Sequence, residues 1–370
     1  MNIGIDARLL NKKITGINRV LWNFIKNIPQ FDSKNRYFLY SYDDSEFNDK
    51  FYTHIKIPRS RFARQIYEHY WLNFKLPGLL AEQKIDLFFT PYFLVPLKKE
   101  NYKNIIVIHD VMTKACRKYF TYHYRKYMDI VVPAAIKRSD AIITISESSR
   151  QDILKYYNVY PEKVHCIHLW TDEKYKPYSF SKAEKENFLK KFGLPEKFIL
   201  FVGAIEERKN IRGILKISDM LLSRGLDIKF VLIGEKSFGF KELYEEILKR
   251  KTRVIYLNYV NEQDLPVLYS SAAIFLFPSY YEGFGLPPLE AMKCGIPVLS
   301  SNNSSLPEVV GDGGMQFNAG DYDSFAESII KLLKNEDFYA LMSAKAIEQS
   351  KKFTPESQMP KLMSLFNSMS

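Results

Sequence analysis

Residues 273–301, AIFLFPSYYEGFGLPPLEAMKCGIPVLSS, hold two short apolar runs separated by a turn and a helical stretch. The runs AIFLFP and IPVLSS each predict a buried strand. Between them, Pro287 and Pro288 suit the first turn of a helix, where a missing N–H costs little. A strand, a helix and a second strand in this order predict a parallel α/β layer structure.

The same alternation of strand and helix patterns extends along the whole chain. Amphipathic helical patterns cover residues 17–28, 63–74 and 124–138. A polar stretch rich in Lys, Tyr and Ser, residues 171–185, interrupts the series and predicts a linker. Two successive series predict two Rossmann-like, doubly wound domains. The remaining strand-like runs are residues 2–5, 36–41, 85–90, 104–110, 141–146, 198–204, 228–234 and 253–258.

Length and composition agree with two globular domains. The chain has 370 residues, and one domain takes about 150. The three cysteines are far apart, which excludes a disulfide framework or a C-x-x-C site and fits a reducing compartment. No apolar run approaches the ~20 residues that span a bilayer, and Asp6 and Arg8 stand where a signal peptide needs its apolar core. We therefore expect a cytoplasmic protein.

The net charge of +11 resides in the first half of the chain. Residues 1–180 hold 29 Lys and Arg against 18 Asp and Glu, whereas the later residues hold 24 of each. This asymmetry predicts a polyanionic partner, either nucleic acid or an acidic lipid surface. The segment 56–75 mixes cations with aromatic residues, as at an anionic interface, or its aromatic residues pack in the core at helical spacing. Its cations are Lys56, Arg59, Arg61 and Arg64, beside Phe62, Tyr67 and Trp71, and the core alternative rests on Ile66, Tyr70 and Phe74.

Two carboxylates flank the glycine-rich turn after the run AIFLFP. Glu282 precedes the turn and Glu290 lies inside the following helix. The amides of residues 283–286 would point from the helix N-terminus, which suits a phosphate or diphosphate, and the carboxylates could accept hydrogen bonds from sugar hydroxyls. Alternatively, Glu282 caps the helix and Glu290 is a solvated surface residue.

Polar groups follow two other predicted strands. After FILFV come Gly203 and the charged residues 206–210, which either hold the same diphosphate or form a solvated charge run. His109 ends the run NIIVIHD, where it either reaches a ligand or is structural. The turn TGINRV near the N-terminus is not G-x-G-x-x-G, which argues against a dehydrogenase.

Together these segments resemble the retaining glycosyltransferases of family four, which have a GT-B fold of two Rossmann-like domains facing a cleft. The similarity rests on EGFGLPPLE, with Glu282 and Glu290 eight positions apart, and spans nearly the whole chain. It implies an acceptor domain over residues 1–175, a nucleotide-sugar domain over residues 176–354, and a helix at 355–370 that crosses back. The other agreeing segments are IGIDARLL with TGINRV, VIHD, AIITISESSRQDI, FVGAIEERKN and FTPESQMPKLMSLF.

The resemblance also implies a role for each matching residue. Two departures from the family pattern are Ala204, where many members have Arg, and Asn18, where many have Gly. The implied catalytic residues are His109, facing the reacting sugar, and Glu282, contacting the donor sugar. The implied donor-binding residues are Gly16, Arg208, Lys209, Phe284, Gly285 and Leu286 for the diphosphate, Tyr259 and Val260 for the base, and Glu290 for the ribose.

The charges at the predicted site determine the expected chemistry. Breaking the bond between sugar and diphosphate places negative charge on the leaving group, which preorganised cations and amides stabilise. We therefore expect neither a metal nor a cofactor. The only D-x-D near the site, Asp321-Tyr322-Asp323, opens an amphipathic stretch and is interpreted as a helix cap. Retention of configuration is implied by the resemblance alone.

The leading hypothesis is an enzyme that transfers a hexose from a nucleotide sugar, with GDP-mannose first and UDP-hexoses next, to a saccharide. The expected acceptor is a lipid-linked envelope glycan, and the protein would be cytoplasmic, with possible attachment to the inner, anionic face of the membrane. One alternative is a basic nucleic-acid-binding protein, although the chain lacks zinc-finger and RNA-binding strand motifs. The other is a sugar-nucleotide-binding protein without turnover.

Overall fold

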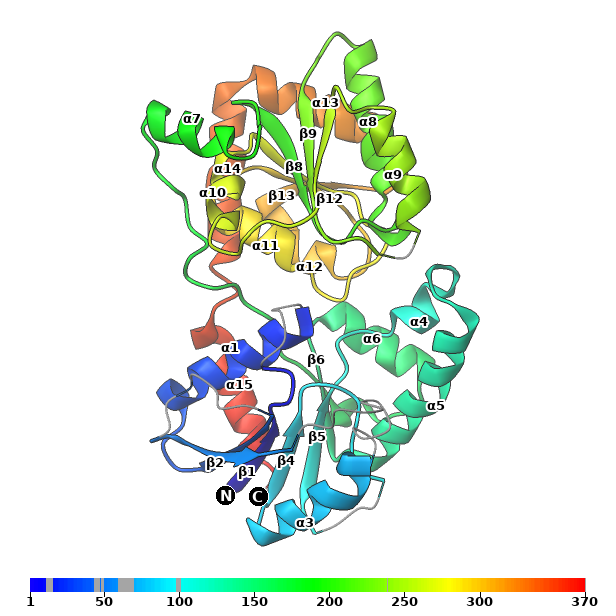
Figure 1. Ribbon diagram of the computed structural model, residues 1–370, viewed down its shortest axis with the longest axis vertical. Helices are drawn as coiled ribbons and strands as arrows, with labels where there is room; N and C mark the ends of the chain where they lie inside the picture. The colour runs from blue at the N-terminus through cyan, green and yellow to red at the C-terminus, as the bar shows by residue number, and fades with distance from the viewer. Residues whose placement is uncertain are drawn as a thin grey trace. The chain divides into compact units, whose positions relative to one another are not determined.

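The computed structural model describes residues 1–10, 16–42, 47, 50–58, 70–97, 101–237 and 239–369. Contacts between Cα atoms divide the chain into two compact units (Figure 1). Unit 1 comprises Met1–Leu169 and Thr354–Ser370, and unit 2 comprises Trp170–Phe353. Both units have the α/β architecture that the alternating sequence pattern predicts, so the predicted fold class is confirmed.

Unit 1 is built on a seven-stranded parallel sheet with the order β3-β2-β1-β4-β5-β6-β7. Its central strands are uninterrupted apolar runs and are buried along their whole length, as expected where helices cover both faces of a parallel sheet. The strands are β1 (Asn2–Asp6), β2 (Arg36–Ser41), β3 (Tyr52–Lys56), β4 (Leu87–Thr90), β5 (Lys103–Val107), β6 (Ala141–Thr144) and β7 (Val164–Cys166).

The helices of unit 1 connect these strands. They are α1 (Gly16–Phe31), the π-helical turn η1 (Trp71–Lys75), α3 (Leu76–Glu82), α4 (Met112–Ala115), the 3₁₀ turn η2 (Arg117–Tyr119), α5 (Tyr122–Arg138), α6 (Glu147–Tyr156), and the 3₁₀ turn η3 (Pro161–Lys163). Helices α5 and α6 begin with a side-chain cap; at α6 the Ser146 hydroxyl accepts a hydrogen bond from the amide of Ser149 at 3.0 Å.

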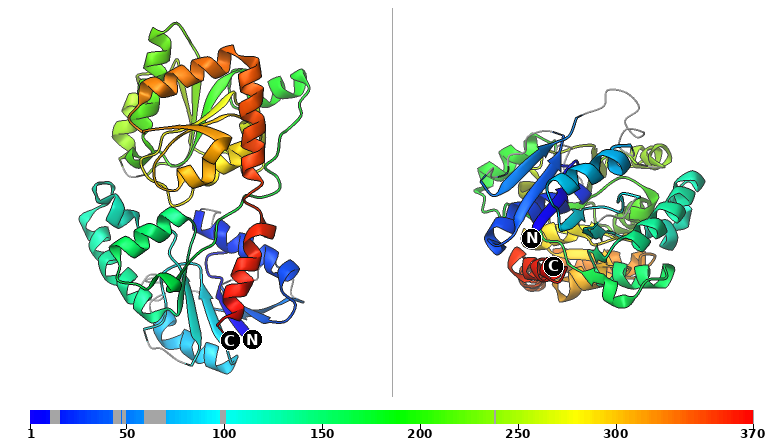
Figure 2. Two further views of the ribbon diagram at one scale, coloured as in Figure 1. Left: turned by 180° about the vertical axis from the view of Figure 1, so that it is seen from behind. Right: turned by 90° about the horizontal axis from the view of Figure 1, so that it is seen from below.

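One further helix, α15 (Pro355–Asn367), returns to unit 1 after the whole of unit 2. It lies beside α1 (Figure 2). Phe366 places its ring 5.6 Å from that of Phe89 on β4, and Phe89 lies 6.1 Å from Phe24 on α1. The returning helix thus completes the core of unit 1.

Unit 2 contains a six-stranded parallel sheet with the order β10-β9-β8-β11-β12-β13. Its strands are β8 (Phe198–Val202), β9 (Lys229–Ile233), β10 (Val254–Leu257), β11 (Ile274–Phe277), β12 (Val298–Ser301) and β13 (Gly314–Phe317). Its helices are α7 (Lys182–Lys190), α8 (Ile211–Ser223), α9 (Phe240–Leu248), α10 (Leu265–Ser271), α11 (Leu286–Lys293), α12 (Leu306–Val310), α13 (Tyr322–Lys334) and α14 (Glu336–Ser350), with the 3₁₀ turns η4 (Glu207–Lys209) and η5 (Gly311–Gly313).

The predicted linker, residues 171–185, is partly folded and belongs to unit 2. Helix α7 begins at Lys182, within the predicted linker, because Ser181 and Glu184 form a capping box. Trp170 is buried, and the Lys293 ammonium donates hydrogen bonds to the carbonyls of Thr171 and Asp172. The start of the linker is therefore packed into unit 2, and the units divide a few residues before the predicted boundary at 175.

Asp321 is a helix cap, as predicted. Its carboxylate accepts hydrogen bonds from the Ser324 amide at 3.2 Å and from the Ser324 hydroxyl at 2.7 Å, at the start of α13.

Three short strands were not predicted: β3, β7 and β13, which all lie at the edges of their sheets. Among the described residues, no helix combines the length and apolarity that crossing a bilayer requires.

The basic and aromatic segment 56–75 is described only in part. Arg59, Arg61, Phe62, Arg64, Ile66 and Tyr67 lie outside the described residues. Trp71 is buried, and the Arg8 guanidinium lies 4.6 Å from its ring centre, which agrees with the alternative that the aromatic residues of this segment pack in the core. Tyr70 and Phe74, on which that alternative rested, are instead 44% and 73% exposed and stack on each other, so their placement in the core was wrong.

Candidate functional site

The candidate donor site lies at the carboxyl edge of the unit 2 sheet. Strands β8 and β11 are neighbours there, and the chain leaves them toward opposite sides of the sheet, toward β9 and β12. At such a switch point the loops that follow the strands separate and leave room for a ligand. The loop after β8 carries Arg208 and Lys209, and the loop after β11 carries Glu282.

Asn210 fixes the loop that follows β8. It adopts a left-handed conformation with φ of 56° and caps α8 by accepting a hydrogen bond from the Gly213 amide at 3.1 Å. Its side-chain amide donates to the carbonyls of Pro278 at 3.1 Å and Ala319 at 2.8 Å. The two cations before Asn210 are thereby held against the loop after β11.

Lys209 and Glu282 form a buried ion pair. The Lys209 Nζ lies 2.6 Å and 2.8 Å from the two carboxylate oxygens of Glu282. Arg208 lies 3.4 Å from the same carboxylate, and it also pairs with Glu206. Lys209 and Glu282 are each 8% exposed, so residues 206–210 are not a solvated charge run, and Glu282 is not an exposed cap.

Burial and charge act in opposite directions on this pair. Burial lowers the pKa of Lys209, and the Glu282 carboxylate offsets only part of that effect. Burial alone would raise the pKa of Glu282, but the charges of Lys209 and Arg208 hold it below its ordinary value. The two cations thus favour the carboxylate form of Glu282, and that carboxylate partly neutralises them.

The turn before α11 is held by two serines from the loop after β12. The Ser304 hydroxyl accepts a hydrogen bond from the Glu282 amide at 2.8 Å. The Ser305 hydroxyl lies within hydrogen-bonding distance of the carbonyls of Glu282, at 3.0 Å, and Phe284, at 2.5 Å. Gly285 has φ of 121°, and a Cβ there would lie 3.0 Å from Leu306, so this position requires glycine.

The first turn of α11 contains no side-chain cap. Gly285 occupies the N-cap position, and no side chain caps the helix there. The amides of Gly285 and Leu286 begin α11, and the positive end of the helix dipole lies there. The N-cap Gly285 stands three residues after Glu282, the carboxylate that pairs with both cations. The combination suits a diphosphate.

Glu290 is buried inside α11, not solvated. It is 2% exposed, and its Oε2 accepts a hydrogen bond of 2.8 Å from the hydroxyl of Tyr269 on α10. Tyr269 is itself fully buried between the rings of Tyr175 and Phe275. The orientation of the Glu290 carboxylate is therefore fixed by a rigid neighbour.

Tyr259 and Val260 lie in the loop after β10, at the edge of the sheet. Tyr259 is 55% exposed and Val260 is buried. Strand β9 separates β10 from β8, so this loop lies two strands away from the cations. A nucleotide whose diphosphate occupies the centre of the sheet edge would extend its base in this direction.

Two predicted site residues belong to unit 1. His109 follows β5, and its Nε2 lies 2.9 Å from the carbonyl of Pro91. Because a carbonyl only accepts, Nε2 carries the proton and Nδ1 is the acceptor. Burial lowers the pKa of His109 to about 4, so the ring is neutral near pH 7. Gly16 is the first residue of α1, directly after a loop outside the described residues.

Sequence reasoning missed a buried polar cluster beside His109. The Arg8 guanidinium makes two hydrogen bonds of 2.8 Å and 2.7 Å to Asp6 and contacts the hydroxyl of Tyr92, which itself lies 2.8 Å from Asp6. Asp6 ends β1 and Tyr92 follows β4, so both stand at the carboxyl edge of the unit 1 sheet. The segment IGIDARLL could have predicted this cluster, because Asp6 and Arg8 stand at the end of a buried strand, where charged residues are rare unless they are paired.

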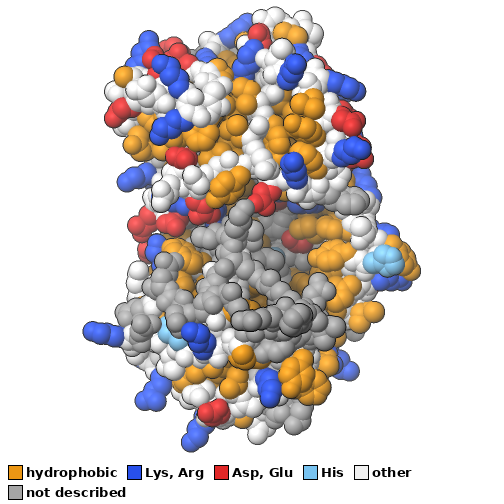
Figure 3. Space-filling view, viewed as in Figure 1, with side chains coloured by type: hydrophobic (Ala, Val, Ile, Leu, Met, Phe, Trp, Pro, Cys, Tyr) orange, Lys and Arg blue, Asp and Glu red, His pale blue; other side chains and the backbone are white. Residues whose placement is uncertain are grey.

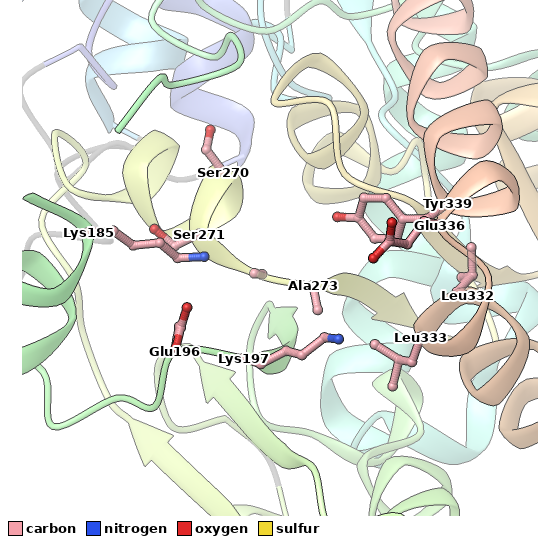
Figure 4. A pocket seen from close by; sticks show the side chains of 11 residues that line it. Lys185, Glu196, Lys197, Ser270, Ser271, Ala273, Leu332, Leu333, Glu336 and Tyr339 are labelled. Atoms are coloured by element: carbon pink, nitrogen blue, oxygen red, sulfur yellow. The ribbon is translucent and has the colours of Figure 1, made fainter. Parts of the chain in front are cut away.

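A cavity of about 560 Å³ in unit 2 lies away from these residues (Figure 4). Its walls include Lys197, just before β8, and Ala273, just before β11. The cavity therefore opens at the amino ends of the strands whose carboxyl ends carry Lys209 and Glu282. In the described part of the chain, no group of three or more His, Cys, Asp and Glu side chains is placed to bind a metal.

Comparisons with known proteins agree with this arrangement. The family model described as "Glycosyltransferase Family 4" matches residues 14–175, and "Glycosyl transferases group 1" matches residues 183–352. The O-antigen chain mannosyltransferase B of Escherichia coli is 33% identical over 282 residues, which cover 75% of this chain and 73% of the relative.

Two further similarities differ in what they cover. The serotype-specific mannosyltransferase WbdA of Escherichia coli is 31% identical over 70% of this chain, which spans only 33% of that longer protein. The structure of Anabaena Alr3699/HepE in complex with UDP and glucose matches with a TM-score of 0.75, 17% identity and full coverage of both chains, which shows the fold. The chain belongs to the family 4, or group 1, glycosyltransferases and has their GT-B fold.

Proposed function

We propose that this glycosyltransferase moves a hexose from a nucleoside-diphosphate sugar to a saccharide, with retention at the anomeric carbon and without a metal ion. The observation that supports it most is the buried pair Lys209–Glu282, which stands directly before the N-terminus of α11. A buried ammonium near the N-terminus of a helix is suited to an anionic leaving group.

Departure of the nucleoside diphosphate requires stabilisation of negative charge. In the proposal, Lys209 and Arg208 face the diphosphate, and the amides of Phe284, Gly285 and Leu286 bind its oxygens. These groups are fixed before the reaction by Asn210 and by the two serines after β12. Preorganised charge of this kind needs no reorganisation when the bond breaks, which lowers the barrier to transfer.

The remaining assignments follow from the chemistry of each group. Glu290 accepts hydrogen bonds from the ribose hydroxyls, while the loop with Tyr259 and Val260 contacts the base. Glu282 accepts from a hydroxyl of the donor sugar with lone pairs that Lys209 leaves open. His109 is neutral, with Nδ1 available as an acceptor, so we assign it to a sugar hydroxyl near the reacting carbon. Gly16 is assigned to the phosphates through its backbone.

The donor is proposed to be GDP-mannose, with UDP-hexoses as the second choice. The name of the Escherichia coli relative, an O-antigen chain mannosyltransferase, supports mannose, and the Anabaena structure with UDP and glucose supports the second choice. The relative's name also supports a lipid-linked envelope glycan as the acceptor. Such an acceptor would place the enzyme at the inner face of the membrane, in the cytoplasm.

A donor screen tests the proposal. Thermal melting would be measured with GDP, UDP, GDP-mannose and UDP-glucose, since a ligand at 100 times its Kd stabilises by about 2.7 kcal/mol. The best donor is then used in a transfer assay with Glu290→Gln, which should weaken nucleotide binding about 10-fold or more. Glu327→Gln, on the exposed side of α13, is the matched control. Equal binding by both variants would refute the ribose assignment.

A further inference from the structure

A buried ion pair in unit 1 has no part in the sugar transfer as proposed above. Asp6 is fully buried, and Arg8 is 5% exposed. On the face of the molecule drawn in Figure 3, by contrast, the lysine and arginine side chains of unit 1 are scattered over the surface. Burying two charges often costs as much free energy as their attraction returns, so stability alone does not explain the pair.

Asp6, Arg8 and Tyr92 form one closed set of hydrogen bonds. The Arg8 Nε and Nη2 atoms donate to the two carboxylate oxygens of Asp6 at 2.8 Å and 2.7 Å. The Tyr92 hydroxyl donates to Asp6 Oδ2 at 2.8 Å and accepts from Arg8 Nη2. The guanidinium also lies 4.6 Å from the ring centre of Trp71 and 5.8 Å from that of Tyr92. The Tyr92 hydroxyl is therefore held by both members of the ion pair.

The cluster stands close to His109 in the sheet. The strand order places β4 between β1 and β5. Asp6 is the last residue of β1, Tyr92 is the second residue after β4, and His109 is the second residue after β5. Because neighbouring parallel strands end at the same edge of a sheet, all three residues lie at the carboxyl edge of unit 1.

Pro91 connects the cluster with the histidine. Its carbonyl lies 2.9 Å from His109 Nε2 and belongs to the peptide group that joins Pro91 to Tyr92. The pyrrolidine ring fixes φ of Pro91, so the direction of this carbonyl depends on ψ. A change in ψ would also move Tyr92. A tyrosine side chain anchored on the ion pair therefore restricts the direction in which the carbonyl points.

The loop after β4, residues 91–97, is anchored at its far end as well. The Leu97 amide donates a hydrogen bond to the side-chain oxygen of Asn73 at 2.8 Å, and the Leu97 carbonyl accepts one from Arg138 Nε at 3.1 Å. At the end of the loop that faces the histidine, the corresponding anchor is the Tyr92 hydroxyl. Removing this hydroxyl should loosen the near end and leave the far end in place.

We propose that Tyr92 is a positioning residue for His109. Its anchored hydroxyl fixes the Pro91 carbonyl, and that carbonyl keeps the ring proton on Nε2. Nδ1 then stays without a proton and can accept a hydrogen bond. In the opposite tautomer Nδ1 would carry the proton and could no longer accept. The effect on turnover rests on the sugar contact that the proposed function gives to His109.

Nitrogen NMR of the whole protein, labelled at histidine, tests the inference directly, because protonated and unprotonated ring nitrogens give well separated signals. The His109 signals are those missing from His109→Gln. The parent should show only the tautomer protonated at Nε2, whereas Tyr92→Phe should show a mixture of both. Tyr40→Phe is the matched control, since it removes a buried hydroxyl from the neighbouring strand β2. It should keep the signals of the parent.

Kinetics test the link to turnover. Tyr92→Phe should lower kcat roughly 3- to 10-fold, about the worth of one hydrogen bond. The Kd of GDP or UDP should not change, because most of the proposed nucleotide contacts belong to unit 2. In a His109→Gln background the same substitution should cause no further loss, since Tyr92 acts through the ring. Tyr40→Phe should turn over like the parent.

Two outcomes would overturn the inference. The first is a Tyr92→Phe protein that melts as a folded protein and keeps the histidine signals of the parent, whatever its kinetics. The second is an equal loss of kcat from Tyr92→Phe in the parent and in the His109→Gln background. Should His109→Gln turn over like the parent, the proposed role of His109 would fail instead, and the nitrogen spectra would still decide whether Tyr92 fixes the ring.

Discussion

Replacing Glu282 by Gln removes a negative charge from the buried pair and preserves the size of the side chain. Lys209 is then left 8% exposed without its counter-ion. Removing one partner of a buried ion pair costs about 3 to 5 kcal/mol, because the remaining charge is uncompensated. At the lower figure, a unit of this size should melt roughly 6 to 12 °C lower.

The same substitution should strengthen the binding of a free nucleoside diphosphate. In the parent protein the Glu282 carboxylate partly neutralises the cations that the diphosphate needs. A carboxylate about 8 Å from a phosphate repels it by about 2 kcal/mol at an effective dielectric constant near 20. Removing that repulsion corresponds to about 30-fold tighter binding. Turnover should fall, since the contact with the sugar is lost and the product leaves more slowly.

Calorimetric titration with GDP or UDP, together with thermal melting, measures both effects. The control is the double variant Lys209→Met with Glu282→Gln, in which neither charge remains. It should recover most of the lost stability and should lose the gain in affinity. This pattern distinguishes a counter-ion from a carboxylate that merely fills space.

A Glu282→Gln protein that melts at the same temperature as the parent and binds nucleotide no more tightly would contradict both expectations. The carboxylate would then not determine the charge at Lys209 in solution. Weaker nucleotide binding, with unchanged binding in the double variant, would equally contradict the proposed competition between Glu282 and the diphosphate.

Three other predictions concern the same enzyme. Tyr269→Phe should raise the donor KM about tenfold with kcat nearly unchanged, because Glu290 loses one hydrogen bond to its carboxylate; steady-state kinetics would contradict this if kcat fell instead. Transfer should continue in excess EDTA, and a loss that Mg²⁺ or Mn²⁺ restores would exclude the metal-free mechanism. Burial lowers the pKa of His109 from 6.5 to about 4, so its contribution to stability is complete above pH 6.5 and is lost as the pH falls toward 4. Thermal melting measured between pH 6.5 and pH 4 should therefore show a smaller fall in Tm for His109→Gln than for the exposed control His123→Gln.

The sequence was sufficient for the central strands because a buried parallel strand is one uninterrupted apolar run. Strands such as Leu87–Thr90 and Ile274–Phe277 are of this kind. In the edge strand Tyr52–Lys56, polar residues are mixed with apolar ones and the strand is only partly buried. Strand Val164–Cys166 is only three residues long. Such strands form because a neighbour offers unpaired hydrogen-bonding groups, which depends on tertiary contacts that no local pattern shows.

The sequence pointed to the residues of the candidate site but not to the ion pair and hydrogen bonds that join them. The glycine and proline residues of the turn predict the start of α11 and so the positions of Glu282, Glu290 and the α11 amides. The end of the preceding apolar run predicts that Lys209 lies at the carboxyl edge of the sheet. The sequence did not show that Lys209 and Glu282 would neutralise each other, since they are far apart in the chain and meet only because β8 and β11 are neighbours. Tyr269 was missed for the same reason, because a tyrosine in an apolar stretch looks like an ordinary core residue.

The return of α15 to unit 1 sets an order of events during synthesis. Unit 2 is one continuous stretch of chain, whereas unit 1 needs residues from both sides of it. On the ribosome, domains ordinarily fold in the order in which they emerge. Here the first segment emerges without the helix that covers Phe24 and Phe89. Until Thr354 and the residues after it leave the exit tunnel, that apolar surface stays open, so the core of unit 1 can be completed only after the whole of unit 2 has been synthesised.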